Sequence, residues 1–323
     1  MIEFLLTSVL TFILTPVTIR VMTSSGVIDV PNRRSSHAAP VPRGGGVACL
    51  VAALISLTAL GALGRGSAPL TALSVVGGLC LVGLGDDVLH VPIAARLAAQ
   101  AIGGALIGLA LGSGWLIVLG LAGTLWVVNV VNFMDGINGI AGLSLALWGT
   151  TAFLVGEERG LSELAIVGAV SAGVSIGFLP WNAPRARIFL GDAGSYLLGA
   201  LAATGLLLGV RDDAPMSLLI APLFIFFLDT TVTILKRIVR GSSVFQAHRE
   251  HTYQRVAGIH EGHQMITSCL VVSLSAVITL SWMSPAIWVP ITVTFIAGAA
   301  YLAAPRIVAR KGNTTPSTAK ERV

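Results

Sequence analysis

The segment NVVNFMDGINGIAG, residues 129–142, follows a long apolar run and places Asn129, Asn132, Asp135 and Asn138 three residues apart. On a continuous helix, steps of three residues would spread these side chains over about half of the circumference. A helix that ends near Asp135 would let them converge. Short side-chain oxygens that converge beside a membrane suit Mg²⁺ or a phosphate-bearing ligand. Helix capping is the alternative, but one cap explains one of these residues and not four.

Two further clusters combine carboxylates with basic side chains. Asp86 and Asp87 end an apolar run in GLGDDVLHV, and Arg96 follows at the start of the next run. Adjacent carboxylates at the edge of an apolar run are costly unless they face water, a cation or a partner, so we expect them to be functional. Asp192, in WNAPRARIFLGDAGS, follows two arginines, and it could bind a ligand, cap the next helix or do both.

Two basic segments complete the set. The segment 29–46 contains Arg43 and three consecutive glycines, which let backbone approach closely; alone, it also fits an ordinary basic loop. The segment 236–264 contains five Lys or Arg residues and four histidines, which suit a nucleotide diphosphate. A zinc site built from its two HxxH pairs is the alternative, which the lack of cysteines there disfavours. Asp229, in the preceding apolar run, is expected to support the structure of the site.

The composition indicates that membrane-spanning helices must position these clusters. The chain of 323 residues is 54% hydrophobic and 11% charged, whereas soluble domains are about 25% charged. A bilayer crossing needs about 20 apolar residues, and eleven runs approach this length. They lie near 2–22, 44–63, 68–85, 94–111, 115–133, 139–156, 164–181, 195–210, 216–235, 265–283 and 286–305. We therefore predict an all-α polytopic membrane protein of about 11 transmembrane helices, with a retained first span rather than a signal peptide.

The distribution of basic residues predicts the orientation. With the N-terminus outside, 17 of the 20 Lys and Arg residues fall on the cytoplasmic side, as do all six histidines. This bias follows the positive-inside rule. We expect a multi-pass protein of the inner (plasma) membrane with a cytoplasmic C-terminus and the active site at the cytoplasmic membrane edge. Residues 1–310 would form one domain, and residues 311–323 a polar, disordered tail. The net charge of +5 reflects this topology, and no nucleic acid partner is expected.

Taken together, the ordered motifs GDD, NFMDGINGIAG, FLGDAGSYLLG and HREHTYQ resemble those of the polyprenyl-phosphate N-acetylhexosamine-1-phosphate transferases, glycosyltransferase family 4. This family is related to the phospho-N-acetylmuramoyl-pentapeptide transferases. The resemblance covers most of the chain. It implies transfer of N-acetylhexosamine 1-phosphate from a UDP-sugar to a polyprenyl phosphate such as undecaprenyl phosphate, with release of UMP. That reaction initiates synthesis of a cell-surface glycan such as O-antigen, teichoic acid or arabinogalactan.

The resemblance also implies roles for individual residues. Mg²⁺ would be required, with Mn²⁺ as an alternative, and its ligands would be Asn132 and Asp192. Catalytic roles fall to Asp86, Asp87, Asp135 and His248, with one aspartate of the GDD motif acting on the lipid phosphate or, alternatively, as a covalent nucleophile. Substrate-binding roles fall to Arg43, Arg96, Asn129, Asn138, Arg249 and His251. Cations are needed because three anionic phosphates must meet in this reaction.

Two other functions also fit a polar, membrane-edge site. An intramembrane prenyltransferase also uses Mg²⁺ and aspartates, but it needs a second Asp-rich motif and leaves the segment 236–264 unexplained. A lipid-linked sugar transporter needs polar groups through the bilayer midplane, whereas nearly all polar groups here are expected at one face. A homodimer is compatible with both enzyme functions, the phosphosugar transferase and the prenyltransferase.

Overall fold

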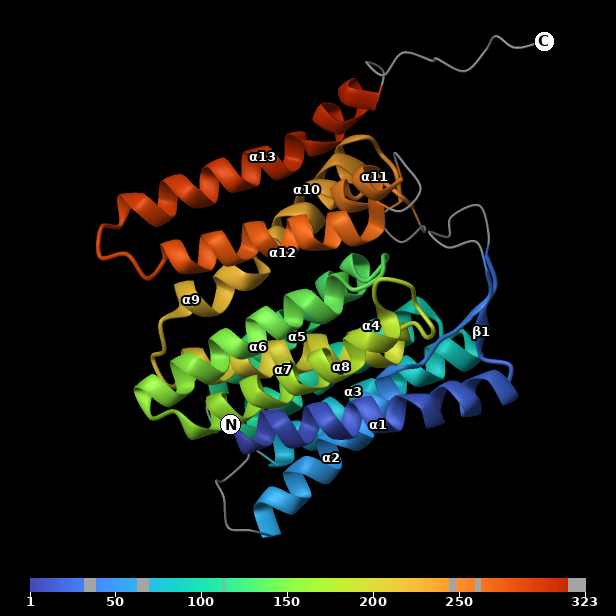
Figure 1. Cartoon of the computed structure of the whole chain (residues 1–323). Helices are drawn as coiled ribbons and strands as arrows, with labels where there is room; N and C mark the ends of the chain where they lie inside the picture. Colours follow the sequence, from blue (N-terminus) through green and yellow to red (C-terminus); the bar gives the residue numbers. More distant parts are fainter. Residues whose placement is uncertain (32–38, 63–69, 113, 244–247, 259–262, 313–323) are drawn as a thin grey trace, which may run out of the picture.

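A computed structural model describes residues 1–31, 39–62, 70–112, 114–243, 248–258 and 263–312, which form a bundle of helices (Figure 1). The helices of the first half are α1 (Ile2–Ser24), α2 (Gly46–Ala62), α3 (Leu70–Leu89), α4 (Ile93–Ala110), α5 (Gly114–Met134) and α6 (Ile140–Arg159). Those of the second half are α7 (Ser162–Asn182), α8 (Gly191–Arg211), α9 (Met216–Ile220), the 3-10 turn η1 (Ala221–Leu223), α10 (Phe224–Val239), α11 (Thr252–Ala257), α12 (His263–Ser281) and α13 (Trp288–Gly312). Two short antiparallel strands, β1 (Ile28–Asp29) and β2 (Val41–Pro42), pair Ile28 with Pro42.

The apolar runs became helices as the sequence predicts. Within the described residues, ten helical spans are long and apolar enough to cross a membrane, with α9, η1 and α10 counted as one span. The eleventh predicted run is α2, a shorter apolar helix of 17 residues. The run predicted over 216–235 is divided at η1, because Pro222 has no N–H to donate. The all-helical, polytopic architecture is therefore confirmed.

Small residues let the helices of the bundle approach closely. A Cβ placed on Gly104 of α4 would lie 2.1 Å from the carbonyl oxygen of Gly120 in α5. A Cβ on Gly177 of α7 would lie 2.3 Å from the carbonyl oxygen of Ser8 in α1. Helices in membranes associate through such small-residue contacts. The helix α8, which begins with GDAGS, is the most buried of the long helices and packs against α3 and α5.

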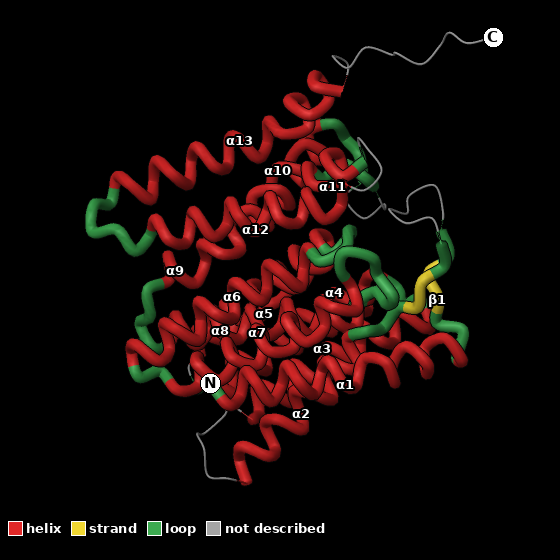
Figure 2. The backbone as a smooth tube through the Cα atoms, viewed as in Figure 1, coloured by secondary structure: helices red, strands yellow, loops and turns green. Residues whose placement is uncertain are grey.

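Polar segments gather at one end of this bundle. Figure 2 shows loops and the two strands at the end where α1, α5 and α7 terminate and α8 begins. Met1 lies at the other end of the bundle, whereas α13 finishes near these loops (Figure 1). In the same view α10, α11, α12 and α13 lie together above the bundle formed by α1 to α8. The sequence motifs therefore meet at one end, between these two groups of helices.

Two helices extend further toward that end than the sequence predicts. The helix α3 continues to Leu89 rather than stopping near residue 85, so Asp86 and Asp87 occupy its last turn. The helix α8 begins at Gly191 rather than near residue 195, so Asp192 lies in its first turn. Both shifts place the carboxylates on rigid helix ends instead of loops.

Candidate functional site

Asp192 is the centre of a polar network between α3, α4, α5 and α8. The Asn132 amide donates hydrogen bonds to the Asp192 Oδ1, at 2.8 Å, and to the Ser195 hydroxyl, at 2.9 Å. A guanidinium nitrogen of Arg96 lies 3.4 Å from the Asp192 Oδ2 and also forms an ion pair with Asp86. Residues separated by up to 106 positions in the chain thus meet around one carboxylate.

Asp87 has a different set of partners from its neighbour Asp86. Its two carboxylate oxygens accept hydrogen bonds from the backbone N–H groups of Asp192 and Ala193, each at 3.1 Å. These N–H groups belong to the free N-terminus of α8, so Asp87 caps that helix from across the bundle. Arg43 donates to the Asp87 carbonyl oxygen at 2.5 Å and lies 3.8 Å from its carboxylate. The N-cap role considered for Asp192 itself is absent, since no side chain of its own segment caps α8.

Gly191 is required where α3 meets the start of α8. Its φ of +73° is in the left-handed region that favours glycine. A Cβ at this position would also lie 2.5 Å from the Asp87 Oδ2 and 2.7 Å from the Gly44 nitrogen. The glycine therefore permits the close approach that lets Asp87 cap the helix.

The segment 129–142 changes from helix to loop where the sequence predicts, because α5 ends at Met134. Its polar side chains then take separate partners. Asn132 reaches Asp192, and the Asn129 amide donates to the Gln100 side chain of α4 at 2.5 Å. The Asn138 amide donates to the Pro184 carbonyl oxygen at 3.0 Å. These contacts join the segment 129–142 to three other parts of the molecule.

The loop that contains Asp135 is held in place from two sides. Tyr253 of α11 donates its hydroxyl to the Phe133 carbonyl oxygen at 2.9 Å. A Cβ on Gly136 would lie 2.1 Å from that hydroxyl oxygen, so glycine is needed there. On the other side, the Gly139 N–H donates to the buried Asn182 side chain at 2.8 Å. Burial, with the carboxylates of Asp192 and Asp87 nearby, raises the pKa of Asp135 well above its ordinary value.

Asp229 anchors the histidine segment, as expected of a supporting residue. This fully buried carboxylate accepts hydrogen bonds from the backbone N–H groups of Thr252 and Tyr253 at 2.9 and 3.2 Å. It also accepts the Tyr301 hydroxyl of α13 at 2.6 Å and lies 3.5 Å from the Nδ1 of His251. Asp229 therefore fixes the start of α11, and with it His251, against α10 and α13.

The two histidines of HREH stack on each other, with ring centroids 5.1 Å apart. Burial, with His251 and Arg237 nearby, lowers the pKa of His248 from its ordinary value. A lowered pKa favours the neutral form of the His248 imidazole.

A cavity of about 680 Å³ lies beside this network, and none of the four aspartates Asp86, Asp87, Asp135 and Asp192 is among its lining residues. Its polar lining comprises Arg96, Asn129, Asn132, Tyr196, His248, His251, Tyr253 and Gln254. Its apolar lining comprises Ile93, Leu97, Leu121, Ala122, Leu125, Trp126, Phe133 and Ile234. A site with one polar and one apolar side, between α4, α5 and α10, suits a ligand that has a charged head and a hydrocarbon tail.

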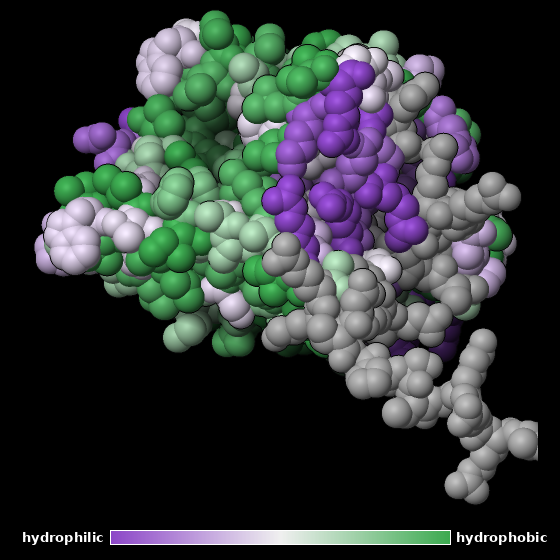
Figure 3. Space-filling view, turned by 90° about the horizontal axis from the view of Figure 1, so that it is seen from above, coloured by the Kyte–Doolittle hydropathy of each residue, from purple (hydrophilic) through white to green (hydrophobic). Residues whose placement is uncertain are grey.

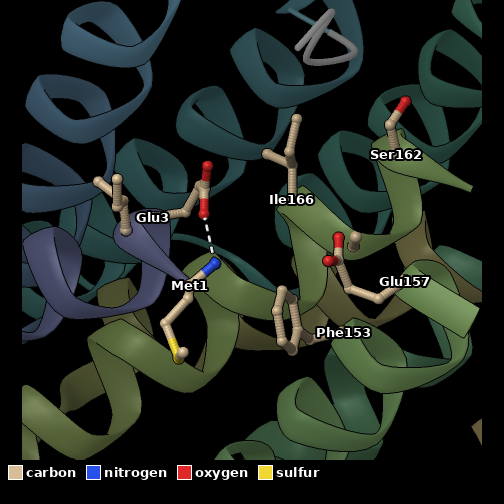
Figure 4. A pocket seen from close by; sticks show the side chains of 8 residues that line it. Met1, Glu3, Phe153, Glu157, Ser162 and Ile166 are labelled. Atoms are coloured by element: carbon tan, nitrogen blue, oxygen red, sulfur yellow. Dashed lines mark hydrogen bonds and ion pairs between the residues drawn. The ribbon is translucent and has the colours of Figure 1, made fainter. Parts of the chain in front are cut away.

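A second cavity, of about 500 Å³, lies at the opposite end of the bundle between α1, α6 and α7. Figure 4 shows Glu3, whose carboxylate contacts the Met1 amine at 2.8 Å, and Glu157 among the other side chains that line this cavity. None of the sequence motifs contributes to this cavity, so the candidate site is the first one.

The oxygen-bearing side chains of the site could bind a cation together with phosphate groups of the substrates. Arg96 pairs with the carboxylates of both Asp86 and Asp192 and offsets part of their repulsion. Asp87 and Asp135 add further carboxylates nearby, whereas the local cations are Arg43 and Arg96. No group of three His, Cys, Asp or Glu side chains in the described part of the chain could hold a metal by itself. Mg²⁺ is typically bound by one or two carboxylates completed by water and phosphate, which this site could provide.

Of the twelve site residues that the sequence suggests, five line the cavity: Arg96, Asn129, Asn132, His248 and His251. The contacts beside it join Arg43, Asp86, Asp87 and Asp192, and Asp135 lies in the loop after α5. Asn138 instead contacts Pro184 and Ser268, and Arg249 is directed elsewhere. Arg249 lines another cavity, with Lys236 and Arg240, although His248 and His251 on either side of it line the candidate site. Sequence reasoning gave no role to Asn182 and Tyr253, which hold the loop and the cavity wall. Asn182 is a polar residue at the end of an apolar run, which is a signal that could have found it.

Comparison with known proteins defines the class of this site. The profile of the family described as Glycosyl transferase family 4 matches residues 69–210, the part of the chain that contains GDD, NFMDG and FLGDAGS. A decaprenyl-phosphate N-acetylglucosaminephosphotransferase of Mycobacterium tuberculosis is 31% identical over 290 residues, which cover 75% of this chain and 71% of the relative. The chain therefore belongs to glycosyl transferase family 4.

Two further relatives extend this similarity over most of the chain. A probable undecaprenyl-phosphate N-acetylglucosaminyl 1-phosphate transferase of Bacillus subtilis is 27% identical over 329 residues, covering 91% of this chain and 88% of the relative. A phospho-N-acetylmuramoyl-pentapeptide-transferase of Symbiobacterium thermophilum is 29% identical over 262 residues, covering 71% of this chain and 78% of the relative. The family resemblance that the motifs indicate is thereby confirmed.

Proposed function

We propose that this protein transfers N-acetylhexosamine 1-phosphate from a UDP-N-acetylhexosamine to a polyprenyl phosphate, releasing UMP and initiating synthesis of a cell-surface glycan. The lipid phosphate oxygen attacks the β-phosphorus of the donor, and the bond to the UMP oxygen breaks. The observation that carries the proposal is the two-sided cavity, whose polar lining includes Arg96 and Asn132, the residues that hold Asp192. The names of the relatives describe the same chemistry.

The walls of the cavity suit the two substrates. The apolar side chains of α4 and α5, among them Leu97, Leu121 and Trp126, would receive the first isoprene units of the acceptor. Arg96 would bind phosphate through its guanidinium group. His248 and His251, on the α11 side, would contact the donor diphosphate and sugar.

Mg²⁺ would be held by Asp192 and Asn132 together with substrate phosphates. The Asn132 amide nitrogen makes both of its described hydrogen bonds, so its Oδ1 is available to a cation. When bound, Mg²⁺ would neutralise phosphate charge and stabilise the transition state. Mn²⁺ would satisfy the same ligands.

The partners of Asp86 and Asp87 suggest separate roles. Both Asp87 oxygens accept backbone N–H groups of α8, so we assign Asp87 to positioning Asp192. Asp86 faces Arg96 and Asp192, and we assign it to orienting or deprotonating the lipid phosphate. Asp135 would act beside it, on the nucleotide side of the site.

We place this site at the cytoplasmic face of the inner membrane. The loops at the site end of the bundle carry most of the Lys and Arg residues. With α2 as a crossing helix, eleven crossings would put Met1 outside and the C-terminus inside. A soluble UDP-sugar and a membrane lipid could then meet at the membrane edge.

Following the β-phosphorus of the donor tests this proposal. Purified protein would be given undecaprenyl phosphate, Mg²⁺ and UDP-N-acetylglucosamine labelled at the β-phosphate, or other UDP-N-acetylhexosamines labelled in the same way. We expect the label to appear in the lipid fraction. Label that stays with the nucleotide while the sugar moves, or no reaction with any donor, would contradict phosphosugar transfer.

A further inference from the structure

Two adjoining basic cavities lie between α10, α11 and α13, apart from the candidate active site. The first, of about 350 Å³, is lined by Thr233, Lys236, Arg240, Arg249, Glu250 and Arg255. The second, of about 300 Å³, is lined by Lys236, Arg255, Ala299, Leu302, Ala303, Pro305 and Arg306. Lys236 and Arg255 line both, so the two cavities adjoin at these side chains. We call the pair the basic groove.

Among the described residues, ion pairs balance only part of the charge of the basic groove. Its single carboxylate, Glu250, forms ion pairs with Arg237 and with Arg240, the latter at 3.3 Å. Among the residues that the structure describes, no carboxylate forms an ion pair with Lys236, Arg255 or Arg306. Closely spaced cations repel each other, and a bound anion would relieve this repulsion.

The basic groove lies at the level where two apolar helices end. The spans Met216–Val239 and Trp288–Ala309 both terminate beside it. Leu235, Ile238 and Ile307, next to its cations, are 54%, 58% and 53% exposed. On the face shown in Figure 3, hydrophilic residues gather in one region bordered by a broad hydrophobic surface. Such a boundary lies where membrane headgroups meet hydrocarbon.

The walls of the groove match the two parts of a phospholipid. Lys236, Arg255 and Arg306 supply charge for a phosphate. Ala299, Leu302, Ala303 and Pro305 supply an apolar wall on the α13 side. None of the described residues that line the groove is aromatic, so it offers no ring on which a nucleotide base could stack.

We propose that the basic groove binds the phosphate headgroup of an anionic membrane phospholipid, with the upper acyl chain against α13. This site is distinct from the cavity that we assign to the transferase substrates. The basic groove and the candidate active site lie on opposite sides of the histidine segment, residues 248–251. Arg249 and Glu250 line the groove, whereas His248 and His251 line the candidate active-site cavity. A bound lipid would therefore brace the segment that carries both histidines.

Binding of phosphatidylglycerol to the full-length protein tests the proposal. The protein in detergent is mixed with phosphatidylglycerol or phosphatidylcholine, and bound lipid is counted by native mass spectrometry. Each basic residue that contacts the headgroup is expected to contribute about fivefold in affinity, as basic residues at an anionic membrane surface do. We therefore expect Arg306→Gln to weaken phosphatidylglycerol binding about fivefold and Lys236→Gln/Arg255→Gln about 25-fold. Arg20→Gln, an exposed arginine at the end of α1, should leave binding unchanged.

The alternatives predict different outcomes. Equal retention of phosphatidylglycerol by the wild type and the double variant would overturn the proposal, provided that melting temperatures show both to be folded. Displacement of phosphatidylglycerol by UDP or inorganic phosphate at similar concentration would instead indicate a site for soluble anions. Displacement of phosphatidylglycerol by a low concentration of undecaprenyl phosphate would instead indicate a second site for the polyprenyl phosphate substrate. Because no turnover is measured, failure of the transferase assay would leave this result interpretable.

Discussion

At the scale of single residues, the neutral side chain of Asn132 is one that we propose to bind the metal. It holds Asp192 through its amide nitrogen at 2.8 Å, and we assign its oxygen to Mg²⁺. Replacing it by alanine should remove one ligand and release the carboxylate. We expect Asn132→Ala to raise the Mg²⁺ concentration needed for half-maximal activity by about 10–100-fold.

The measurement is activity against Mg²⁺ concentration, with Asn138→Ala as the matched control. Asn138 contacts Pro184 and not Asp192, so its substitution should leave the magnesium dependence unaltered. An unchanged magnesium dependence in Asn132→Ala would remove Asn132 from the proposed metal site.

The raised pKa of Asp135 leads us to predict how the reaction rate depends on pH. Burial and neighbouring carboxylates raise the pKa of Asp135, so its carboxylate form is populated only at higher pH than for an ordinary aspartate. If the carboxylate is the active form, kcat/KM falls as pH decreases through this raised pKa. Higher Mg²⁺ should shift the fall to lower pH, because a nearby cation favours the carboxylate.

Rate measurements from about pH 5 to pH 9 would check this, since they cover a carboxylate pKa raised by burial. The acidic fall should be absent from the residual activity of Asp135→Asn. If kcat/KM of that variant fell on the acidic side with the same midpoint pH, the titrating group would be another residue.

At the scale of elements, the start of α8 is defined by a residue of α3. Asp87 accepts two backbone N–H groups of α8 and is only 4% exposed. Asparagine keeps one acceptor oxygen, so Asp87→Asn should cost about 1–2 kcal/mol of stability. It should also weaken Mg²⁺ binding by displacing Asp192, and higher Mg²⁺ should restore part of the activity.

This outcome distinguishes positioning from covalent catalysis. If Asp87 were the nucleophile, no concentration of Mg²⁺ would restore turnover in Asp87→Asn. Thermal unfolding in detergent and activity at two Mg²⁺ concentrations are the two readouts.

The helices also show which features of the fold can be predicted from local sequence. Hydrophobic length alone predicts the long helices, and the turn at Asp135 and Gly136 correctly ends α5 at Met134. The short helix α11 was not predicted, because its position depends on Asp229, 23 residues earlier in the chain. The cap that Asp87 provides joins residues 105 positions apart, and no local pattern reports such a partner.

At the scale of the whole molecule, the separation of polar and apolar surface determines where the reaction could occur. The candidate cavity and the basic groove both lie at the end of the bundle where the cationic loops gather. We predict that this end faces the cytoplasm. Clustering by residue type was predictable from sequence, whereas the direction of Arg249 away from the candidate cavity required the fold.

Cysteine labelling in cells would test the orientation. Cys269 is exposed and is replaced by alanine, whereas Cys49 and Cys80 are buried. A membrane-impermeant maleimide should label Ser162→Cys, at the start of α7, in intact spheroplasts. It should label Ser242→Cys, just after α10, only after permeabilisation. The reverse pattern would place the active site on the outside.

The most direct test of the account is UMP release by the purified protein, with and without polyprenyl phosphate, compared with Asp192→Asn. The variant keeps the size of the side chain but loses the charge at the centre of the network. We predict lipid-dependent UMP release by the wild type that falls at least about a hundredfold in the variant. Near-wild-type UMP release by a folded Asp192→Asn protein, or release that does not require the lipid, would contradict the account.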